Sequence, residues 1–338
     1  MQRWFLNIIL FALLNPLLSQ TGGDNVYEFL NLTHSGLVSS IGGNNVSLFE
    51  NLNLAYHNPA LLNASMNKSL ALDFTNYFAG INYGLAMYAI SSGQKNNFAA
   101  GITYLNYGSF READASGTIT GTFNASEYAL NLLYSRNIDS LFSFGVNLKP
   151  VLSHLEKYSS FGVAFDLGLA WHNRNNLISA GLTVRNIGYQ VTTYAGEQRQ
   201  KLPFEVIAGF SARLAHAPFR FSVTARHLEK FDLTYQYSDT GDEQKNDALE
   251  NIMRHMIAGV ELIPHRNFYF SAGYNYQRRR ELQTEAKVAT TGLSWGFGIR
   301  SSFLNIEFGR STYHLAGSSN HISLIMSPDM IINNYMKK

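Results

Sequence analysis

Few polar residues of this chain are spaced for chemistry, and the first set lies in the stretch SFGVAFDLGLAWH. Its alternate positions carry Ser160, Asp166 and His172, the residue types of nucleophilic acyl transfer. An extended strand rises about 3.3 Å per residue, so Asp166 and His172 are roughly 20 Å apart and do not pair. A catalytic triad assembled from different strands, as in a lipid-modifying enzyme, remains an alternative. No local motif supports one, and we expect a non-enzymatic protein with no catalytic residue.

Metal and cofactor chemistry are not favoured either. The chain has no cysteine, which excludes disulfides, thiol catalysis and cysteine-ligated zinc. Its 10 histidines show no i, i+2 or i, i+4 clustering of the kind that binds a metal. The run GFGIRS lacks the third glycine of a dinucleotide-binding loop. We therefore expect no metal and no cofactor, and a net charge of +2 gives no reason to expect nucleic acid as a partner.

Single charged residues form the second polar set, because they interrupt segments that are otherwise apolar or small. They could line a channel, or pair with one another and with an internal segment, and we favour pairing. The set comprises Asp73, Lys149, Asp166, Arg185, Glu205, Arg213, Arg220, Arg226, Glu261, Arg300 and Glu307.

The elements that carry these residues are long strands, each with one hydrophobic face. In 160–172 the large residues alternate with glycine, alanine and polar residues, and the segments at 142–149, 219–226, 268–277 and 292–300 repeat the pattern. A lipid-facing strand needs about 9–11 residues of such alternation. About fourteen segments qualify from Ser69 onward, which predicts an all-β membrane protein, an antiparallel outer-membrane β-barrel of about 14 strands. A secreted β-sandwich is the alternative.

The connections alternate in length, as expected of an outer-membrane barrel with short periplasmic turns and long outer loops. Short connections are predicted at 91–97, 172–176, 216–218 and 264–267. Long ones are predicted at 107–126, 186–201, 238–251 and 277–291.

The chain before the first strand lacks the alternating pattern of the strands. Residues 1–19 have a basic start, a short apolar core and a small residue at the end, which is typical of a cleaved signal peptide. A transmembrane anchor is the alternative. We predict a hatch at 20–66 within the lumen, a barrel at 67–327 and a C-terminal tail at 328–338. In the hatch, Asn25 and Glu28 suggest one helix start, and Asn58 before Pro59 and Ala60 suggests another.

Glycines on the inward face of the strands point to the same hatch. Glycine within a strand costs stability and often marks the close approach of another backbone. We expect the hatch to pack against the inward Gly84, Gly101, Gly145, Gly162, Gly168, Gly181, Gly209, Gly259, Gly273 and Gly296.

An NPA motif just before a first barrel strand resembles the FadL-like outer-membrane barrels, in which it closes an N-terminal hatch. Within that group the chain resembles the PorQ family of the type IX secretion system of Bacteroidetes. The likeness rests on GGDNVYEFLNL, IGGNNVSLF, HNPALLN, YFAGINYG, EYALNLLYSR and HAPFRFSVTARHLEKFDLTYQY, which span Gly22 to Tyr237. The last strand lacks the terminal aromatic residue that is common in such barrels.

The resemblance implies an integral outer-membrane component of the attachment complex. It would anchor a PorZ-like surface protein beside PorV-like and PorU-like partners while cargo is processed and attached to lipopolysaccharide. We expect a partner loop around Asp239, Asp242 and Glu243, and contact of lipopolysaccharide with Arg278, Arg279 and Arg280, whose guanidinium groups suit phosphates. The alternative is a FadL-type channel for uptake of hydrophobic small molecules. The polar inward face of the strands does not favour passage of a hydrophobic substrate through the lumen.

Overall fold

The computed structural model describes residues 25–233, 248–282, 290–314 and 317–329. The predicted signal peptide at 1–19 and the candidate partner residues Asp239, Asp242 and Glu243 lie outside this part of the chain. The same holds for all but the first two residues of the tail predicted at 328–338.

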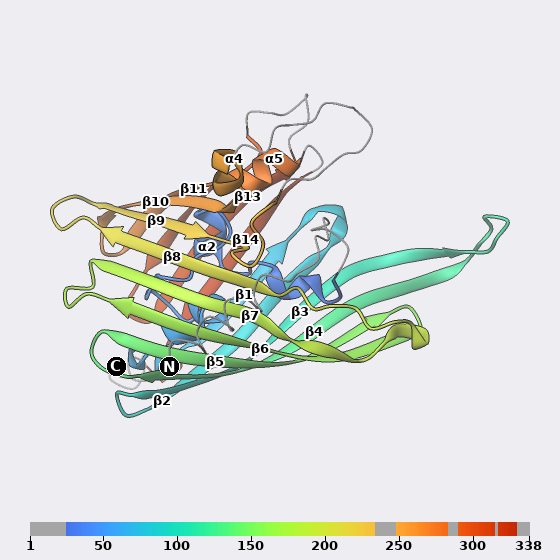
Figure 1. Cartoon of the computed structure of the whole chain (residues 1–338), viewed down its shortest axis with the longest axis horizontal. Coiled ribbons are helices and arrows are strands. Elements are labelled where there is room, and N and C mark those ends of the chain that lie inside the picture. The colour runs from blue at the N-terminus through green and yellow to red at the C-terminus, as the bar shows by residue number, and fades with distance from the viewer. Residues whose placement is uncertain (1–24, 234–247, 283–289, 315–316, 330–338) are drawn as a thin grey trace, which may run out of the picture.

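The described chain forms one closed barrel of antiparallel strands (Figure 1). Each strand pairs with its neighbours in sequence, and β1 pairs with β14 from Leu70 opposite Met326 to Asn76 opposite Asn320. The prediction of about 14 strands in an all-β membrane barrel is confirmed. The strands are β1 (Leu70–Asn76), β2 (Asn82–Ser92), β3 (Asn96–Ala113), β4 (Ile119–Asn137), β5 (Phe142–Leu155), β6 (Tyr158–His172), β7 (Ile178–Thr192), β8 (Glu205–Arg213), β9 (Phe219–Ala225), β10 (Met256–His265), β11 (Phe268–Asn275), β12 (Leu293–Arg300), β13 (Leu304–His314) and β14 (Gly317–Met326).

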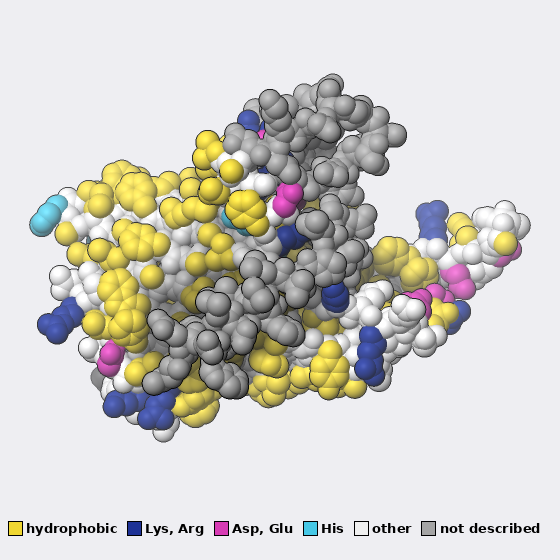
Figure 2. Space-filling model, in the orientation of Figure 1, with side chains coloured by type: hydrophobic (Ala, Val, Ile, Leu, Met, Phe, Trp, Pro, Cys, Tyr) yellow, Lys and Arg dark blue, Asp and Glu magenta, His cyan; other side chains and the backbone are white. Residues whose placement is uncertain are grey.

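The outside of the barrel is hydrophobic. From Phe161 to Leu169 of β6 the exposed side chains are Phe161, Phe165, Leu167 and Leu169, and the side chains between them are buried or half-buried. Large apolar side chains cover the wall in the same way on the face shown in Figure 2. This band is the surface that lipid requires. Among the described residues no helix is long and apolar enough to cross a membrane.

The two ends of the barrel differ. The turns after β2, β4, β6, β8, β10 and β12 are short and mark the turn end. The outer end carries the β3–β4 hairpin, which projects beyond the rest of the barrel in Figure 1, and the helices α4 (Ala248–His255) and α5 (Tyr276–Leu282).

Two of the predicted long loops are wrong. Residues 107–126 are mostly strand, because β3 and β4 stay paired through bulges as far as Ala113 and Ile119. Residues 186–201 begin as strand too, since β7 runs to Thr192. The β3 extension is exposed on both faces near the hairpin tip, so it lacks the apolar alternation by which we recognised strands. In the β7 extension the buried residues include the polar Asn186 and Gln190, so it lacks that alternation too.

The hatch occupies the lumen and supplies nearly half of the buried hydrophobic residues. Its buried side chains meet inward side chains of the wall, for example Leu52 and Tyr56 with Leu85 and Met87. Its elements are η1 (Glu28–Asn31), α2 (Gly36–Ser40), α3 (Leu54–His57), η2 (Pro59–Leu61) and η3 (Ala64–Met66). Four further helices lie elsewhere in the described chain: η4 (Phe78–Gly80) and η5 (Tyr194–Gly196) join strands, and α4 and α5 stand at the outer end.

Wall glycines let the hatch backbone approach closely. A Cβ atom on Gly181 would lie 1.8 Å from the carbonyl oxygen of Val46, and one on Gly145 would lie 2.3 Å from the carbonyl carbon of Pro59. Gly162, Gly168, Gly209, Gly259, Gly273 and Gly296 also meet the hatch. Gly84 and Gly101 do not, because the atoms nearest their missing side chains belong to the adjacent strand.

We expect Gly181→Ala to destabilise the folded barrel, because the added methyl group would overlap the Val46 carbonyl. Overpacking of this kind costs about 1–3 kcal/mol. The matched control is Gly121→Ala in β4, where only the flexible carboxylate of Glu112 lies within reach, at 3.1 Å. The temperature at which the heat-modifiable gel mobility is lost measures the effect. Equal melting of the two variants would contradict a tight contact between hatch and wall.

Candidate functional site

The contact between hatch and wall is the candidate functional site, because it decides whether the lumen is open. Glu50 of the hatch is its charged anchor at the turn end. The carboxylate of Glu50 pairs with Arg220 of β9, and its Oε2 lies 2.7 Å from Nη1 of Arg300 in β12. Burial would raise the pKa of Glu50, but the charges of Arg220 and Arg300 outweigh it and lower the pKa to about 2. Glu50 therefore stays ionised and ties the hatch to two strands.

Arg220 is itself held by the wall. Its Nε and Nη2 donate to the two carboxylate oxygens of Glu261 in β10, at 2.7 and 2.6 Å. The guanidinium thus holds one carboxylate in a bidentate pair and presents its remaining nitrogen to Glu50.

Two wall carboxylates hold hatch backbone and amide groups. Glu307 of β13 accepts hydrogen bonds from the Leu37 N–H at 3.2 Å and from Asn51 Nδ2 at 2.6 Å. Asp73 of β1 accepts one from Asn53 Nδ2 at 2.7 Å. Both carboxylates are buried, so these donors satisfy groups that would otherwise be costly in the lumen.

A third group of contacts lies on the opposite wall. Nζ of Lys149 lies 2.6 Å from Asp166 Oδ1, and both side chains are fully buried. Arg185 donates from Nη2 to the Leu30 carbonyl at 2.8 Å, and its guanidinium stacks over the ring of Tyr56 at 5.3 Å. Of the predicted inward charges, all except Arg213 pair with each other or with the hatch; Arg213 is exposed and makes no ion pair with a described residue.

The Asn58–Pro59–Ala60 motif lies against β5, β6 and β7. Asn58 caps η2, because its Oδ1 accepts the Ala60 N–H at 3.0 Å. Its Nδ2 donates to the carbonyls of Val46, at 2.9 Å, and Leu169, at 3.1 Å. One side chain therefore joins two parts of the hatch to the wall. At the other predicted start, Asn25 is no cap: it donates to the Glu28 side chain at 2.9 Å, and Tyr27 precedes η1 instead.

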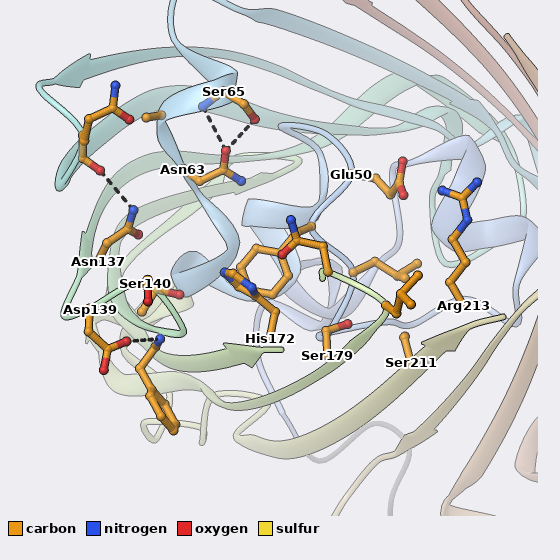
Figure 3. Close-up of a pocket in the computed structure, with 18 of the residues that line it drawn as sticks. Glu50, Asn63, Ser65, Asn137, Asp139, Ser140, His172, Ser179, Ser211 and Arg213 are labelled. Carbon is orange, nitrogen blue, oxygen red and sulfur yellow. Dashed lines mark hydrogen bonds between the residues drawn. The ribbon is translucent and has the colours of Figure 1, made fainter. Parts of the chain in front are cut away.

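A polar cavity of about 490 Å³ opens at the turn end (Figure 3). Hatch residues line one side, including Glu50 and Asn63, and wall residues such as His172, Ser211 and Arg213 line the other. Its lining also includes the apolar residues Leu48, Phe49, Phe142 and Leu177. No group of three or more potential metal ligands occurs in the described ranges.

The outer end has a different lining. Tyr77, Ile81, Tyr107 and Tyr194 are partly exposed and pack on buried hatch and wall residues such as Phe29, Leu30 and Leu202. We call these four residues and Leu32 the aromatic vestibule. Beside it a cavity of about 240 Å³ is lined by Leu32, Arg226, His227, Arg278 and Tyr313, among others.

The structure separates the three arginines predicted to contact lipopolysaccharide. Arg278 turns inward, with its guanidinium 4.0 Å from the Tyr313 ring centroid. Arg280 donates from Nη2 to Glu250 at 2.6 Å. Arg279 makes no hydrogen bond or ion pair with any described residue. Sequence reasoning missed Glu50, Asn51 and Asn53 as anchors, because polar residues of an irregular segment carry no periodic signal.

Comparison with known proteins places the fold. No family model matches the sequence, and no curated protein matches it. Among solved structures, the toluene transporter TodX of Pseudomonas putida superposes with a TM-score of 0.52 at 12% identity, over 87% of this chain and 97% of that one. A FadL homologue of Pseudomonas aeruginosa gives 0.50 at 10% identity, over 90% and 99% of the two chains.

The fold is therefore that of FadL-type outer-membrane barrels. At this level of identity the likeness concerns the fold alone, and what those proteins transport is a property of theirs.

We expect acid to loosen the hatch through His34. Burial lowers the pKa of His34 to about 3, and both ring nitrogens lack a hydrogen-bond partner. In the unfolded chain the imidazole of His34 has a pKa near 6.5 and therefore binds a proton more readily than in the folded barrel. The free energy of unfolding consequently decreases as the pH falls below about 6.5. This amounts to about 2 kcal/mol by pH 5.

The melting temperature at pH 7.5 and pH 5 measures this loss. His34→Phe should lose less stability than the wild type, because phenylalanine keeps the edge-on contacts with Tyr56 and Tyr83 without titrating. The exposed His154→Phe should behave as the wild type does. An unchanged pH dependence in His34→Phe would refute the assignment.

Proposed function

We propose that this protein is a gated outer-membrane channel for a hydrophobic small molecule and that the hatch is its gate. The observation that carries the proposal is the aromatic vestibule, a half-buried apolar surface that hatch and wall build together at the outer end. The FadL-type fold supports it, since TodX and the FadL homologue share the architecture.

The vestibule couples binding to the hatch. Tyr27 and Leu30 of the hatch belong to the same buried cluster as the wall residues Tyr83 and Leu105. The hydroxyl of Tyr27 lies 2.5 Å from Ser160 Oγ in β6. An apolar ligand that inserts between these groups competes with hatch side chains for the same contacts.

Passage requires the hatch to move. The wall glycines touch hatch backbone, and the charged anchors bind it at the turn end, so the hatch obstructs the described lumen. The inward face of the wall is rich in glycine, serine and charged residues. Such a surface binds a packed peptide segment better than it binds a hydrophobic ligand. We therefore place ligand recognition at the vestibule and transport in a displaced state of the hatch.

The absence of cysteine makes a covalent lock of the hatch testable. Ser47 of the hatch and Ser211 of β8 face each other with their Oγ atoms 2.7 Å apart. Oxidation of the Ser47→Cys/Ser211→Cys variant should reduce uptake of radiolabelled toluene by proteoliposomes to that of empty vesicles, and a reductant should restore it.

A matched lock distinguishes gating from a rigid wall. Ser211 lies opposite Ser222 of β9, so Ser211→Cys/Ser222→Cys joins two wall strands and leaves the hatch free. This variant should transport normally when oxidised. Full transport by the oxidised hatch lock, with the crosslink verified by mass spectrometry, would contradict the gate.

A second candidate function is the anchoring of a surface protein, as the likeness to the PorQ family suggests. The projecting β3–β4 hairpin favours it, because Phe110 and Phe123 stack there at a centroid distance of 5.3 Å, beyond the outward Tyr104–Tyr128 pair. Exposed aromatic residues on an ordered element are typical binding hot spots, and a fixed platform lowers the ordering cost of binding.

Under this second function, Phe110→Ser/Phe123→Ser should release a PorZ-like partner from cells into the medium while the barrel stays folded. Ile119→Ser at the hairpin tip is the control, since this exposed side chain makes no aromatic pair. Retention of the partner on cells by the double variant, or its absence from pull-downs of the native protein, would exclude the hairpin as the anchor.

A further inference from the structure

The helices α4 and α5 form a compact pair at the outer end of the wall. Glu250 of α4 accepts hydrogen bonds from Arg254, at 3.0 Å, and from Nη2 of Arg280 in α5, at 2.6 Å. The guanidinium of Arg280 also lies 6.0 Å from the ring of Tyr276, at the start of α5. We call this pair the helix shelf.

The shelf exposes an apolar face. Leu249, Ile252 and Met253 of α4 are 64%, 50% and 39% exposed. They occupy positions i, i+3 and i+4, so they share one side of the helix, and the buried Arg254 lies away from that side. Figure 2 shows hydrophobic side chains where Figure 1 places α4, next to the hydrophobic wall.

The shelf stands at the height where lipid meets water. His255 ends α4 and Met256 begins β10, while β11 ends at Asn275 and α5 begins at once with Tyr276. The rings of Tyr274 and Tyr276 contact each other there, 6.4 Å apart. Tyrosines at the end of lipid-facing strands mark the interface of a membrane barrel.

We propose that the helix shelf binds an acylated, anionic glycolipid of the outer leaflet. Acyl chains would lie against Leu249, Ile252 and Met253, and a headgroup phosphate would bind Arg279. This proposal is independent of what passes through the lumen.

Continuity with the lipid-facing wall favours lipid as the occupant. Below α4 the outward residues of β9 and β10 begin with the paired Val223 and Ala258 and continue toward the turn end with Phe221 and Leu262, so the apolar face of α4 extends a surface that lipid already covers. An amphipathic helix in this place lies in the interface with its apolar side toward the acyl chains.

Charge favours an anionic headgroup. The two helices carry four arginines and two glutamates. Arg254 and Arg280 share Glu250, and Arg278 stacks on Tyr313, so Arg279 is left without a described partner. A basic side chain beside an anionic surface contributes attraction, and arginine binds phosphate with two hydrogen bonds.

Single cysteines can test the apolar face, since the chain has none of its own. Ile252→Cys carries a bimane label in nanodiscs whose lipids bear a nitroxide near the headgroup. Phe221→Cys is the lipid-facing control and Ser116→Cys, in the exposed β3–β4 turn, is the aqueous control. The Ile252→Cys label should be quenched about threefold more than the Ser116→Cys label, as expected for a helix seated in the interface.

A second measurement tests the headgroup. Binding of lipopolysaccharide to the purified barrel should weaken about fivefold in Arg279→Gln, the effect of one basic residue at an anionic surface. Arg174→Gln, in the β6–β7 turn at the opposite end, should bind as the wild type does. In both measurements heat-modifiable mobility verifies folding.

Equal quenching at Ile252→Cys and Ser116→Cys would overturn the lipid contact. Protection of the Ile252→Cys thiol in native membranes but not in nanodiscs would show a protein occupant and overturn it too. Unchanged lipopolysaccharide affinity of Arg279→Gln would overturn the headgroup site.

Discussion

The structure depends on one constraint: a backbone that crosses lipid as strands must pair every N–H and C=O group within the sheet. The β1–β14 pairing meets this constraint by removing both sheet edges. Closure also creates an interior, however, and an interior of buried charge needs partners. The hatch supplies them through Glu50, Asn51 and Asn53, which meet Arg220, Glu307 and Asp73.

The two faces of the barrel wall therefore require different side chains. Outward positions need bulk and carry phenylalanine and leucine, as in β6. Inward positions need room, and glycine at Gly145, Gly168 and Gly181 admits the hatch backbone to within contact distance. Each glycine costs strand stability and gains close packing in return. The outer end differs from both faces, because its tyrosines are only half-buried and do not form a polar surface.

Much of this was predictable from period-two alternation, which depends only on the environment of each face. The number of strands, the internal position of the hatch and most of its glycine contacts follow from that signal. The extended β3–β4 hairpin does not, because both faces of its tip meet water and the alternation disappears there. Nor do the anchors Glu50, Asn51 and Asn53, whose partners lie in strands far away in sequence. Their identity depends on how an irregular segment lies in three dimensions.

The hatch also bears on the closure of the barrel. It precedes every strand in the chain, yet it binds Asp73 in β1 and Glu307 in β13, on the two sides of the β1–β14 seam. It touches β5 and β6 through Pro59 and Ala60 as well. The contacts with Asp73 and Glu307 lie on both sides of the β1–β14 pairing. The segment that is synthesised first therefore stabilises the pairing of the first strand with the last.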